Sequence, residues 1–207
     1  MGNSGASSDG TEPTVLKVLG RALAQTQGLL AAVGPAQLSW PTPCGHWDVG
    51  TLLGHVVRAD LANFLARAQN RSPDWGAGPL RMEAGWVEEF RTGARELAAA
   101  WAAVPAGAES AGPGGAAVPL ISAADQQSAV LAAHGWDLAR ATGQNPELDE
   151  VVGEYALAWA RRSLRPEHRG PEKAFGAEVP VPEQAGVYER LAGWFGRDPG
   201  WEPTPPG

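Results

Sequence analysis

His134-Gly-Trp-Asp-Leu-Ala-Arg-Ala-Thr-Gly143 is the most informative stretch of this chain. It is typical of the end of an amphipathic helix, because its apolar residues follow helical spacing and glycine commonly ends helices. His134 therefore lies among apolar neighbours. His55 lies in a second stretch of the same character, far upstream. Two inward-facing histidines on different helices indicate a shared site in the core of a helical bundle.

The rest of the chain predicts further helices and no strand. Apolar spacing, with Gly and Pro as breaks, favours helices over about 13–33, 49–69, 81–104, 122–143 and 147–164. Ser122 and Asp125 resemble a capping box. The Ala/Gly/Pro-rich residues 105–119 predict a long flexible connection. We therefore expect an all-α fold: a four-helix bundle with a long crossover, an extra helix and an irregular C-terminal tail, from Phe175, that ends in a short helix.

Length, charge and cysteine content narrow the class of protein. The 207 residues suit one domain, expected over 13–201, between a disordered tail at 1–12 and a short tail at 202–207. A net charge of -7 argues against a nucleic-acid partner. We find no apolar run long enough for a membrane and no signal peptide. Together with the single Cys44, which cannot form an intramolecular disulfide, these features predict a cytoplasmic protein.

The two histidines raise the question of a third metal ligand. A catalytic zinc site typically takes three protein ligands, and the position four before His134 shares its helical face. That position holds Val130, which cannot coordinate a metal. Asp137, three residues after His134, is either a carboxylate ligand or a group that orients the imidazole; the alternative is an ordinary ion pair with Arg140. Without a metal, His55, His134 and Asp137 form a general acid–base set.

Other residues have weaker functional interpretations. Arg58, one turn beyond His55, is a candidate anion contact, with a surface role as the alternative. Trp136 is a candidate substrate contact, because surplus Trp residues can line a ligand pocket, with helix packing in the core as the alternative. We interpret Cys44 as a buried structural cysteine whose one nearby base is His46. His46 and His168 are predicted to lie in solvated loops. Any single histidine also fits a hydrogen-bonded core residue.

Three motifs together resemble a known family. The segment Thr42-Pro-Cys-Gly-His-Trp-Asp-Val-Gly-Thr-Leu-Leu-Gly-His55 resembles the first metal-ligand helix of the DinB-like superfamily. The stretch at 134–143 and the ending Phe175-Gly-Ala-Glu-Val-Pro-Val-Pro resemble one actinobacterial branch of it more closely. That branch is related to the N-terminal domain of mycothiol-dependent maleylpyruvate isomerase. The resemblance covers nearly the whole chain from about Pro13.

The resemblance implies a helical bundle that binds a divalent metal, zinc or nickel, and uses a low-molecular-weight thiol such as mycothiol. When the family's ligand positions are carried over to this sequence, the first ligand is His55 and the last is His134. The ligand between them falls on Val130. The implied protein is a thiol-dependent transferase or isomerase that acts on a small molecule, as a monomer or homodimer, with an incomplete metal site. Two alternatives remain: a metal-free bundle used for acid–base tailoring or cyclisation in secondary metabolism, and a non-catalytic ligand-binding protein.

Overall fold

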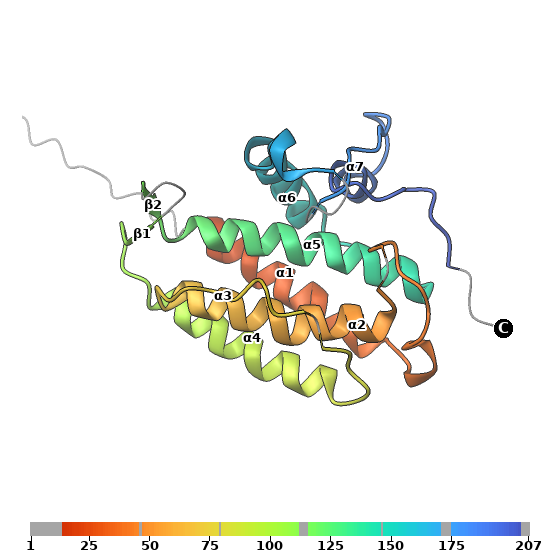
Figure 1. The fold of residues 1–207 in the computed structure, drawn as a ribbon, viewed down its shortest axis with the longest axis horizontal. Helices are drawn as coiled ribbons and strands as arrows, with labels where there is room; N and C mark the ends of the chain where they lie inside the picture. Colours follow the sequence, from red (N-terminus) through yellow and green to blue (C-terminus); the bar gives the residue numbers. More distant parts are fainter. Residues whose placement is uncertain are drawn as a thin grey trace, which may run out of the picture.

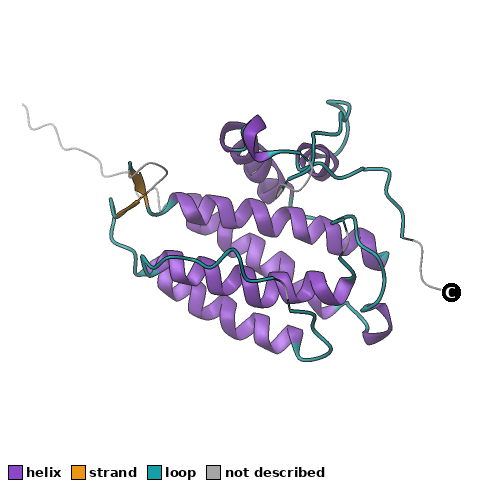
Figure 2. Ribbon diagram, viewed as in Figure 1, coloured by secondary structure: helices purple, strands orange, loops and turns teal. Residues whose placement is uncertain are grey.

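The computed structural model describes residues 14–45, 47–78, 80–111, 116–145, 147–170 and 175–203. Four long helical rods form a bundle (Figure 1). Their bounds are α1 (Thr14–Ala31), the continuous run α2 (Val49–Gly54), η2 (His55–Asp60) and α3 (Leu61–Ala68), then α4 (Trp86–Ala102) and α5 (Ser122–Thr142). Helix also dominates Figure 2, so the predicted all-α class is confirmed. The disorder predicted for 1–12 and the end of the C-terminal tail, 204–207, lie outside the described residues.

The C-terminal part of the chain covers the outer side of α5. Helix α6 (Glu150–Ser163) packs against α5, and α7 (Val187–Trp194) packs against α6 (Figure 1). Two short 3-10 turns, η1 (Pro35–Gln37) and η4 (Pro166–His168), lie in the connections. Helices α6 and α7 are the extra helix and the short final helix that the sequence predicts, with their ends displaced slightly. Among the described residues, no helix combines the length and apolar content needed to cross a membrane.

Helix α5 is the central element of the core. Its neighbours include α1, α6 and α7, so it is buried on several sides. Alanines supply much of its buried surface, among them Ala129, Ala132 and Ala139. Small side chains let neighbouring helices approach, and larger ones such as Leu131 and Leu138 fill the remaining space. His134 therefore lies on the most enclosed helix of the fold.

The long crossover lies between α3 and α4, which corrects the prediction that it spans 105–119. Residues 69–85 run back along α2 and α3 (Figure 1). The backbone N–H of Asp74 donates to Asn63 Oδ1 (2.7 Å), and that of Met82 donates to Gly50 O (2.9 Å). The predicted crossover instead contains an antiparallel hairpin of β1 (Glu109–Ala111) and β2 (Ala117–Pro119). Composition alone cannot distinguish a loop pinned by side chains from one that doubles back on itself.

The start of α5 differs from the predicted capping box. The Ser122 hydroxyl donates to Pro119 O (2.7 Å), and Asp125 accepts a hydrogen bond from the Tyr155 hydroxyl of α6. Asp125 is thus used for a tertiary contact with α6, whereas Ser122 bonds a backbone carbonyl three residues before it. The capping-box prediction is wrong, because a long-range partner competes with the local backbone for the same polar groups.

One glycine sets how closely the crossover approaches the helix before His55. A Cβ atom placed on Gly54 would lie 1.4 Å from the carbonyl oxygen of Leu80. No side chain fits there, so the backbone of the crossover lies directly against α2. The close approach holds the crossover beside the turn in which His55 lies.

Candidate active site

A pocket of about 750 Å³ opens between the bundle and the C-terminal segment. Its wall is formed by the loop around Cys44, the η2 turn, Trp75 of the crossover, the face of α5, Phe175 with Gly176, and the segment at 195–197. The residues that matter for its chemistry are Cys44, His55, Asp60, Val130, His134 and Arg197. The two predicted histidines therefore do line one cavity.

The turn that carries His55 is π-helical rather than α-helical. Residues His55–Asp60 form η2, between two α-helical stretches. A π turn contains one more residue than an α turn, so positions five apart come onto one face. In an α-helix those positions would be about 140° apart. His55 Nε2 lies 3.3 Å from Asp60 Oδ1 as a result.

His134 faces His55 across the pocket. The two ring centroids are 5.1 Å apart and nearly perpendicular, at 82°. The Trp47 ring packs against both, with centroid distances of 4.5 Å to His55 and 6.2 Å to His134. His134 Nδ1 lies 3.2 Å from Asp137 Oδ2. That contact leaves Nε2 as the ring nitrogen available for other chemistry.

Asp137 is fully buried and binds an arginine from the C-terminal segment. Arg197 Nε donates to Asp137 Oδ1 (3.2 Å), and Nη2 donates to Oδ2 (2.9 Å). The alternative partner expected from helical spacing, Arg140, instead donates to the carbonyls of Pro199 and Trp201. Asp137 therefore contacts His134 in the way expected of a group that orients the imidazole.

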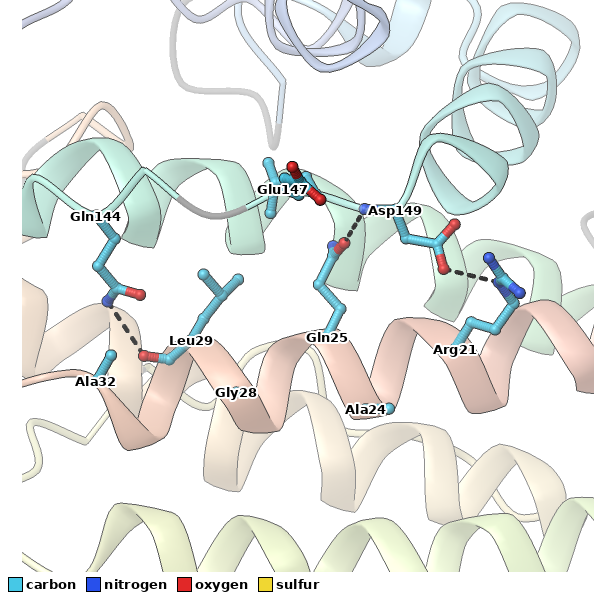
Figure 3. Close-up of a pocket in the computed structure, with 10 residues that line it drawn as sticks. Arg21, Ala24, Gln25, Gly28, Leu29, Ala32, Gln144, Glu147 and Asp149 are labelled. Atoms are coloured by element: carbon cyan, nitrogen blue, oxygen red, sulfur yellow. Dashed lines mark hydrogen bonds and ion pairs between the residues drawn. The ribbon is translucent and has the colours of Figure 1, made fainter.

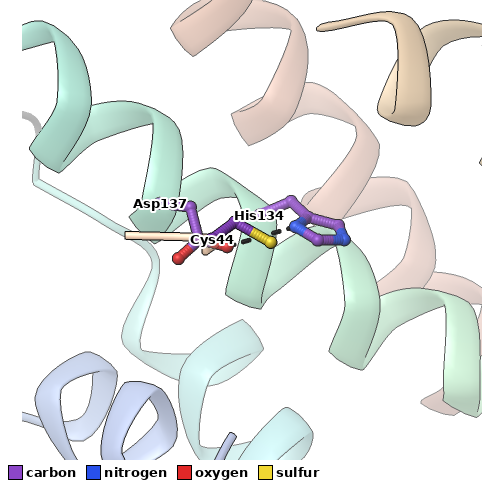
Figure 4. A group of neighbouring side chains, drawn as sticks. All are labelled: Cys44, His134 and Asp137. Atoms are coloured by element: carbon purple, nitrogen blue, oxygen red, sulfur yellow. Dashed lines mark hydrogen bonds and ion pairs between the residues drawn. The ribbon is translucent and has the colours of Figure 1, made fainter. Parts of the chain in front are cut away.

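Cys44 lies at the pocket wall and is only half-buried, so its interpretation as a buried structural cysteine is wrong. Arg197 Nη2 donates to Cys44 Sγ over 3.4 Å. Donor atoms of Cys44, His134 and Asp137 all lie within 4.8 Å of one another (Figure 4). The neighbouring base is thus His134. The base predicted from sequence, His46, lies outside the described residues.

The pKa values of the titratable groups in the pocket are shifted in opposite directions. Burial opposes the charged form of His134, but hydrogen bonds to Asp137 and Cys44 outweigh it and raise its pKa to about 10. Burial and the positive charges of His134 and Arg197 lower the pKa of His55 to about 3. Burial also raises the pKa of Asp60 to about 7, against the opposing charge of His134. At neutral pH the pocket thus pairs an imidazolium with a neutral imidazole, an arrangement typical of acid–base sites.

Two predicted substrate contacts lie elsewhere. Arg58 is on the surface, where it donates to both carboxylate oxygens of Glu89 on α4 (2.8 and 3.1 Å), as in its alternative interpretation. Trp136 is buried away from the pocket, under the Arg140 guanidinium (5.6 Å to the ring centroid). It is two residues from His134, or about 200° around an α-helix, so it occupies the opposite face. In both cases the rotation of the helix from one residue to the next turns the side chain away from the pocket.

The remaining predicted positions are where the sequence places them. Val130 lies on the pocket wall, one turn from His134, and contributes no donor. His168 is exposed in η4, as expected of a solvated histidine. Asp60 is the residue that sequence analysis missed. Its signal is a carboxylate within an apolar run, Val56-Val57-Arg-Ala-Asp60-Leu61, since an acidic side chain rarely lies on a buried face without a partner.

A second groove, of about 610 Å³, lies between α1 and the connection from α5 to α6 (Figure 3). Its polar groups are engaged with one another: Arg21 pairs with Asp149 (2.7 Å), and the Asp149 N–H donates to Gln25 Oε1 (2.6 Å). Gln144 Nε2 donates to Leu29 O (3.2 Å). These bonds tie α1 to α6, so the groove fits a structural joint better than a site.

Comparison with known proteins places the chain in a family. Residues 19–139 match the sequence pattern of the family described as mycothiol maleylpyruvate isomerase N-terminal domain. Uncharacterized proteins of two Mycobacterium tuberculosis strains, CDC 1551 and H37Rv, are each 33% identical to it over 178 residues, which cover 82% of this chain and 90% of theirs.

A solved structure has the same fold. A histidine-to-alanine mutant of the mycothiol-dependent maleylpyruvate isomerase superposes with a TM-score of 0.55 at 16% identity. The match covers 71% of this chain and 68% of that one, and at this identity it bears on the fold alone. The resemblance inferred from the three sequence motifs is confirmed. By its sequence and its fold, the chain belongs to the mycothiol maleylpyruvate isomerase N-terminal domain family.

Proposed function

We propose that this protein is a small-molecule enzyme, a thiol-dependent isomerase or transferase, and that its reaction takes place between His55 and His134. One observation carries the proposal: two imidazoles from different helices face each other, 5.1 Å apart, in a pocket of about 750 Å³. A cavity of this size suits a small organic molecule. The thiol is inferred from the family, whose structural relative is named as mycothiol-dependent.

The donor set of the pocket fits a divalent metal such as zinc or nickel. Imidazole nitrogens suit both ions, and His55 and His134 would hold the metal. His134 already has the carboxylate partner that usually orients a metal-binding histidine, since its Nδ1 contacts Asp137. When bound, the metal would act as a Lewis acid that lowers the pKa of a coordinated thiol or water.

The chain's own groups prepare the pocket for this chemistry. Asp137 fixes the ring of His134, and Arg197 fixes Asp137 through two hydrogen bonds. Trp47 covers both histidine rings and limits the access of water to them. A substrate in this pocket would therefore meet rigid donors in a largely apolar environment, in which electrostatic interactions are strong.

The test is thiol-dependent turnover by untagged protein. Maleylpyruvate, the substrate in the structural relative's name, is supplied with mycothiol, and with glutathione in a parallel assay. We expect His55→Ala to abolish the thiol-dependent rate. His168→Ala, which removes an exposed histidine of η4, is the matched control and should leave it unchanged. A His55→Ala protein that is folded and as active as the wild type would refute the site; a rate independent of thiol would refute the reaction type.

A metal-free acid–base enzyme is the second candidate function. The two facing rings, 5.1 Å apart, favour it, because one imidazole can accept a proton from a substrate while the other donates one to it. A tailoring or cyclisation step would suit such a pair. Full activity after exhaustive treatment with a chelator would favour this candidate over the metal-dependent one.

A further inference from the structure

We propose that Asp60 is the third protein ligand of a divalent-metal site that it forms with His55 and His134. It would take the place of the ligand that is missing at Val130. The inference rests on the proposed function only for the use of the metal in catalysis, because metal binding itself can be measured without any activity. The ligand set would be two imidazoles and one carboxylate, with further positions open to water or a thiol.

The distances between the donor atoms suit a shared ion. One ligand atom each from His55, Asp60 and His134 lies within 4.8 Å of the others. Two ligands bound at roughly 2.0–2.1 Å to a tetrahedral zinc lie about 3.3 Å apart, and His55 Nε2 is 3.3 Å from Asp60 Oδ1. As a hydrogen bond, the same separation would be long. The pair is thus spaced as two ligands rather than as donor and acceptor.

Asp60 also has an unused oxygen in a buried position. The residue is 3% exposed, and among the described residues its Oδ2 atom has no hydrogen-bond partner. A buried carboxylate without full pairing destabilises the fold, so such groups are normally paired or bound to a metal. A divalent cation beside both histidines would remove that cost.

The other carboxylate of the pocket is not free to serve. Both oxygens of Asp137 accept hydrogen bonds from Arg197, and Oδ2 also contacts His134. Of the two roles that the sequence offers for Asp137, a group that orients His134 therefore fits better than a direct metal ligand. Asp60 is the acidic residue with an unoccupied donor atom at this wall.

The backbone is arranged to bring Asp60 to this place. The π turn of η2 interrupts an otherwise α-helical run, and π turns occur frequently at functional sites. The extra residue moves Asp60 onto the face of His55, where an α-helix would not put it. The energetic cost of the irregular turn and the cost of the buried carboxylate thus have one common explanation.

The experiment measures zinc binding by the untagged full-length chain, by dialysis against zinc and a competing chelator. We expect the wild type to bind about one zinc per chain. We expect Asp60→Asn, which keeps the shape of the side chain, to weaken binding at least about 100-fold, because even the loss of a residue behind a ligand costs about 10–100-fold. Glu89→Gln, a surface carboxylate of α4, is the matched control and should bind as the wild type does.

A rescue variant addresses misfolding of Asp60→Asn. The double variant Asp60→Asn with Val130→Glu places a carboxylate one turn before His134, on the same pocket wall, and should recover zinc binding. Circular dichroism checks the fold of each variant. Zinc binding by Asp60→Asn equal to that of the wild type, or a wild type that binds no zinc, would overturn the proposal.

Assays of thiol-dependent turnover on the same samples separate the two proposals. If the wild type binds zinc, Asp60→Asn does not, and the wild type has no thiol-dependent activity, the metal site is supported and the proposed function is refuted. A wild type that is active with thiol while Asp60→Asn binds zinc normally refutes the metal site and supports the function.

Discussion

The two helices of the pocket each present a histidine and an aspartate, but they do so with different backbone geometries. On α5 the pair is His134 and Asp137, three residues apart in a regular α-helix. On η2 the pair is His55 and Asp60, five residues apart in a π turn. The first spacing is visible to anyone who draws a helical wheel, and the second is not. The comparison teaches that a pair of polar side chains in contact can be hidden by a single extra residue in a turn.

The two aspartates also have different surroundings. Asp137 has both oxygens occupied by Arg197 and His134, and these interactions lower its pKa despite burial. Asp60 has one oxygen without a partner among the described residues, and burial raises its pKa to about 7. The first carboxylate stabilises the fold and orients an imidazole. Burial opposes the charged form of the second, so we expect its ionisation to destabilise the fold.

The largest effect should come from Gly54, the glycine before His55, and the glycine after His134, Gly135, is its control. Gly54→Ala puts a Cβ atom 1.4 Å from Leu80 O, a backbone atom that cannot move without displacing the crossover. We expect a loss of more than about 4 kcal/mol in the free energy of unfolding, or no folded protein. Gly135→Ala puts its Cβ atom 3.2 Å from a flexible Leu29 methyl group, and should change stability by about 1 kcal/mol or less. Urea unfolding measures both; similar losses would mean that the crossover does not press on α2.

The next effect tests the satisfied carboxylate of α5. Arg197→Met leaves Asp137 buried without its cation, so we expect the free energy of unfolding to fall by roughly 3–5 kcal/mol. Arg58→Met is the matched control, because it breaks an arginine–carboxylate pair of similar geometry on the surface. Its loss should be about 1 kcal/mol or less. Equal losses would show that burial of the Asp137 pair adds nothing to its contribution.

The smallest effect concerns the unsatisfied carboxylate of η2 in chelator-treated protein. The pKa of Asp60 is raised from 3.8 to about 7 in the folded state, so the stability that its protonated form contributes is present below about pH 4 and lost as the pH rises to about 7. Asp60→Asn cannot lose a proton. We expect it to be more stable than the wild type at pH 7, on the order of 2 kcal/mol, with no gain at pH 4.

A pH series of urea unfolding curves measures this difference. Asp137→Asn should behave in the opposite way, because its pKa is lowered in the folded state: the variant loses stability at pH 7 and loses less in acid. If Asp60→Asn gained as much at pH 4 as at pH 7, the gain would come from packing and not from the charge of Asp60.

Several features of the fold and the site are accessible from the sequence because they depend on local spacing. The helices, the apolar faces and the position of His55 and His134 inside the bundle follow from periodicity. So does the contact of His134 with Asp137. The Val130 gap is readable in the same way, because one helical turn separates it from His134. The family, too, is identified by local motifs.

The remaining features depend on contacts between segments far apart in the chain. Arg197, 60 positions from Asp137, displaces the nearer Arg140 as its partner, because the C-terminal segment brings a guanidinium to the buried carboxylate. Cys44 reaches His134 across the same pocket. The crossover lies at 69–85 because Asn63, Gly50 and Gly54 offer it bonds and space on α2 and α3.

What the sequence determined by itself is a bundle with two facing histidines and a gap at Val130, where the family resemblance implies a ligand, because helical periodicity and apolar burial act over a few residues at a time. What only the tertiary structure decided is which polar groups meet at that gap. The π turn brings Asp60 onto the face of His55, while Arg197 occupies Asp137. Both outcomes depend on how the crossover and the C-terminal segment pack against the bundle, and packing between distant segments has no period that a single sequence reveals.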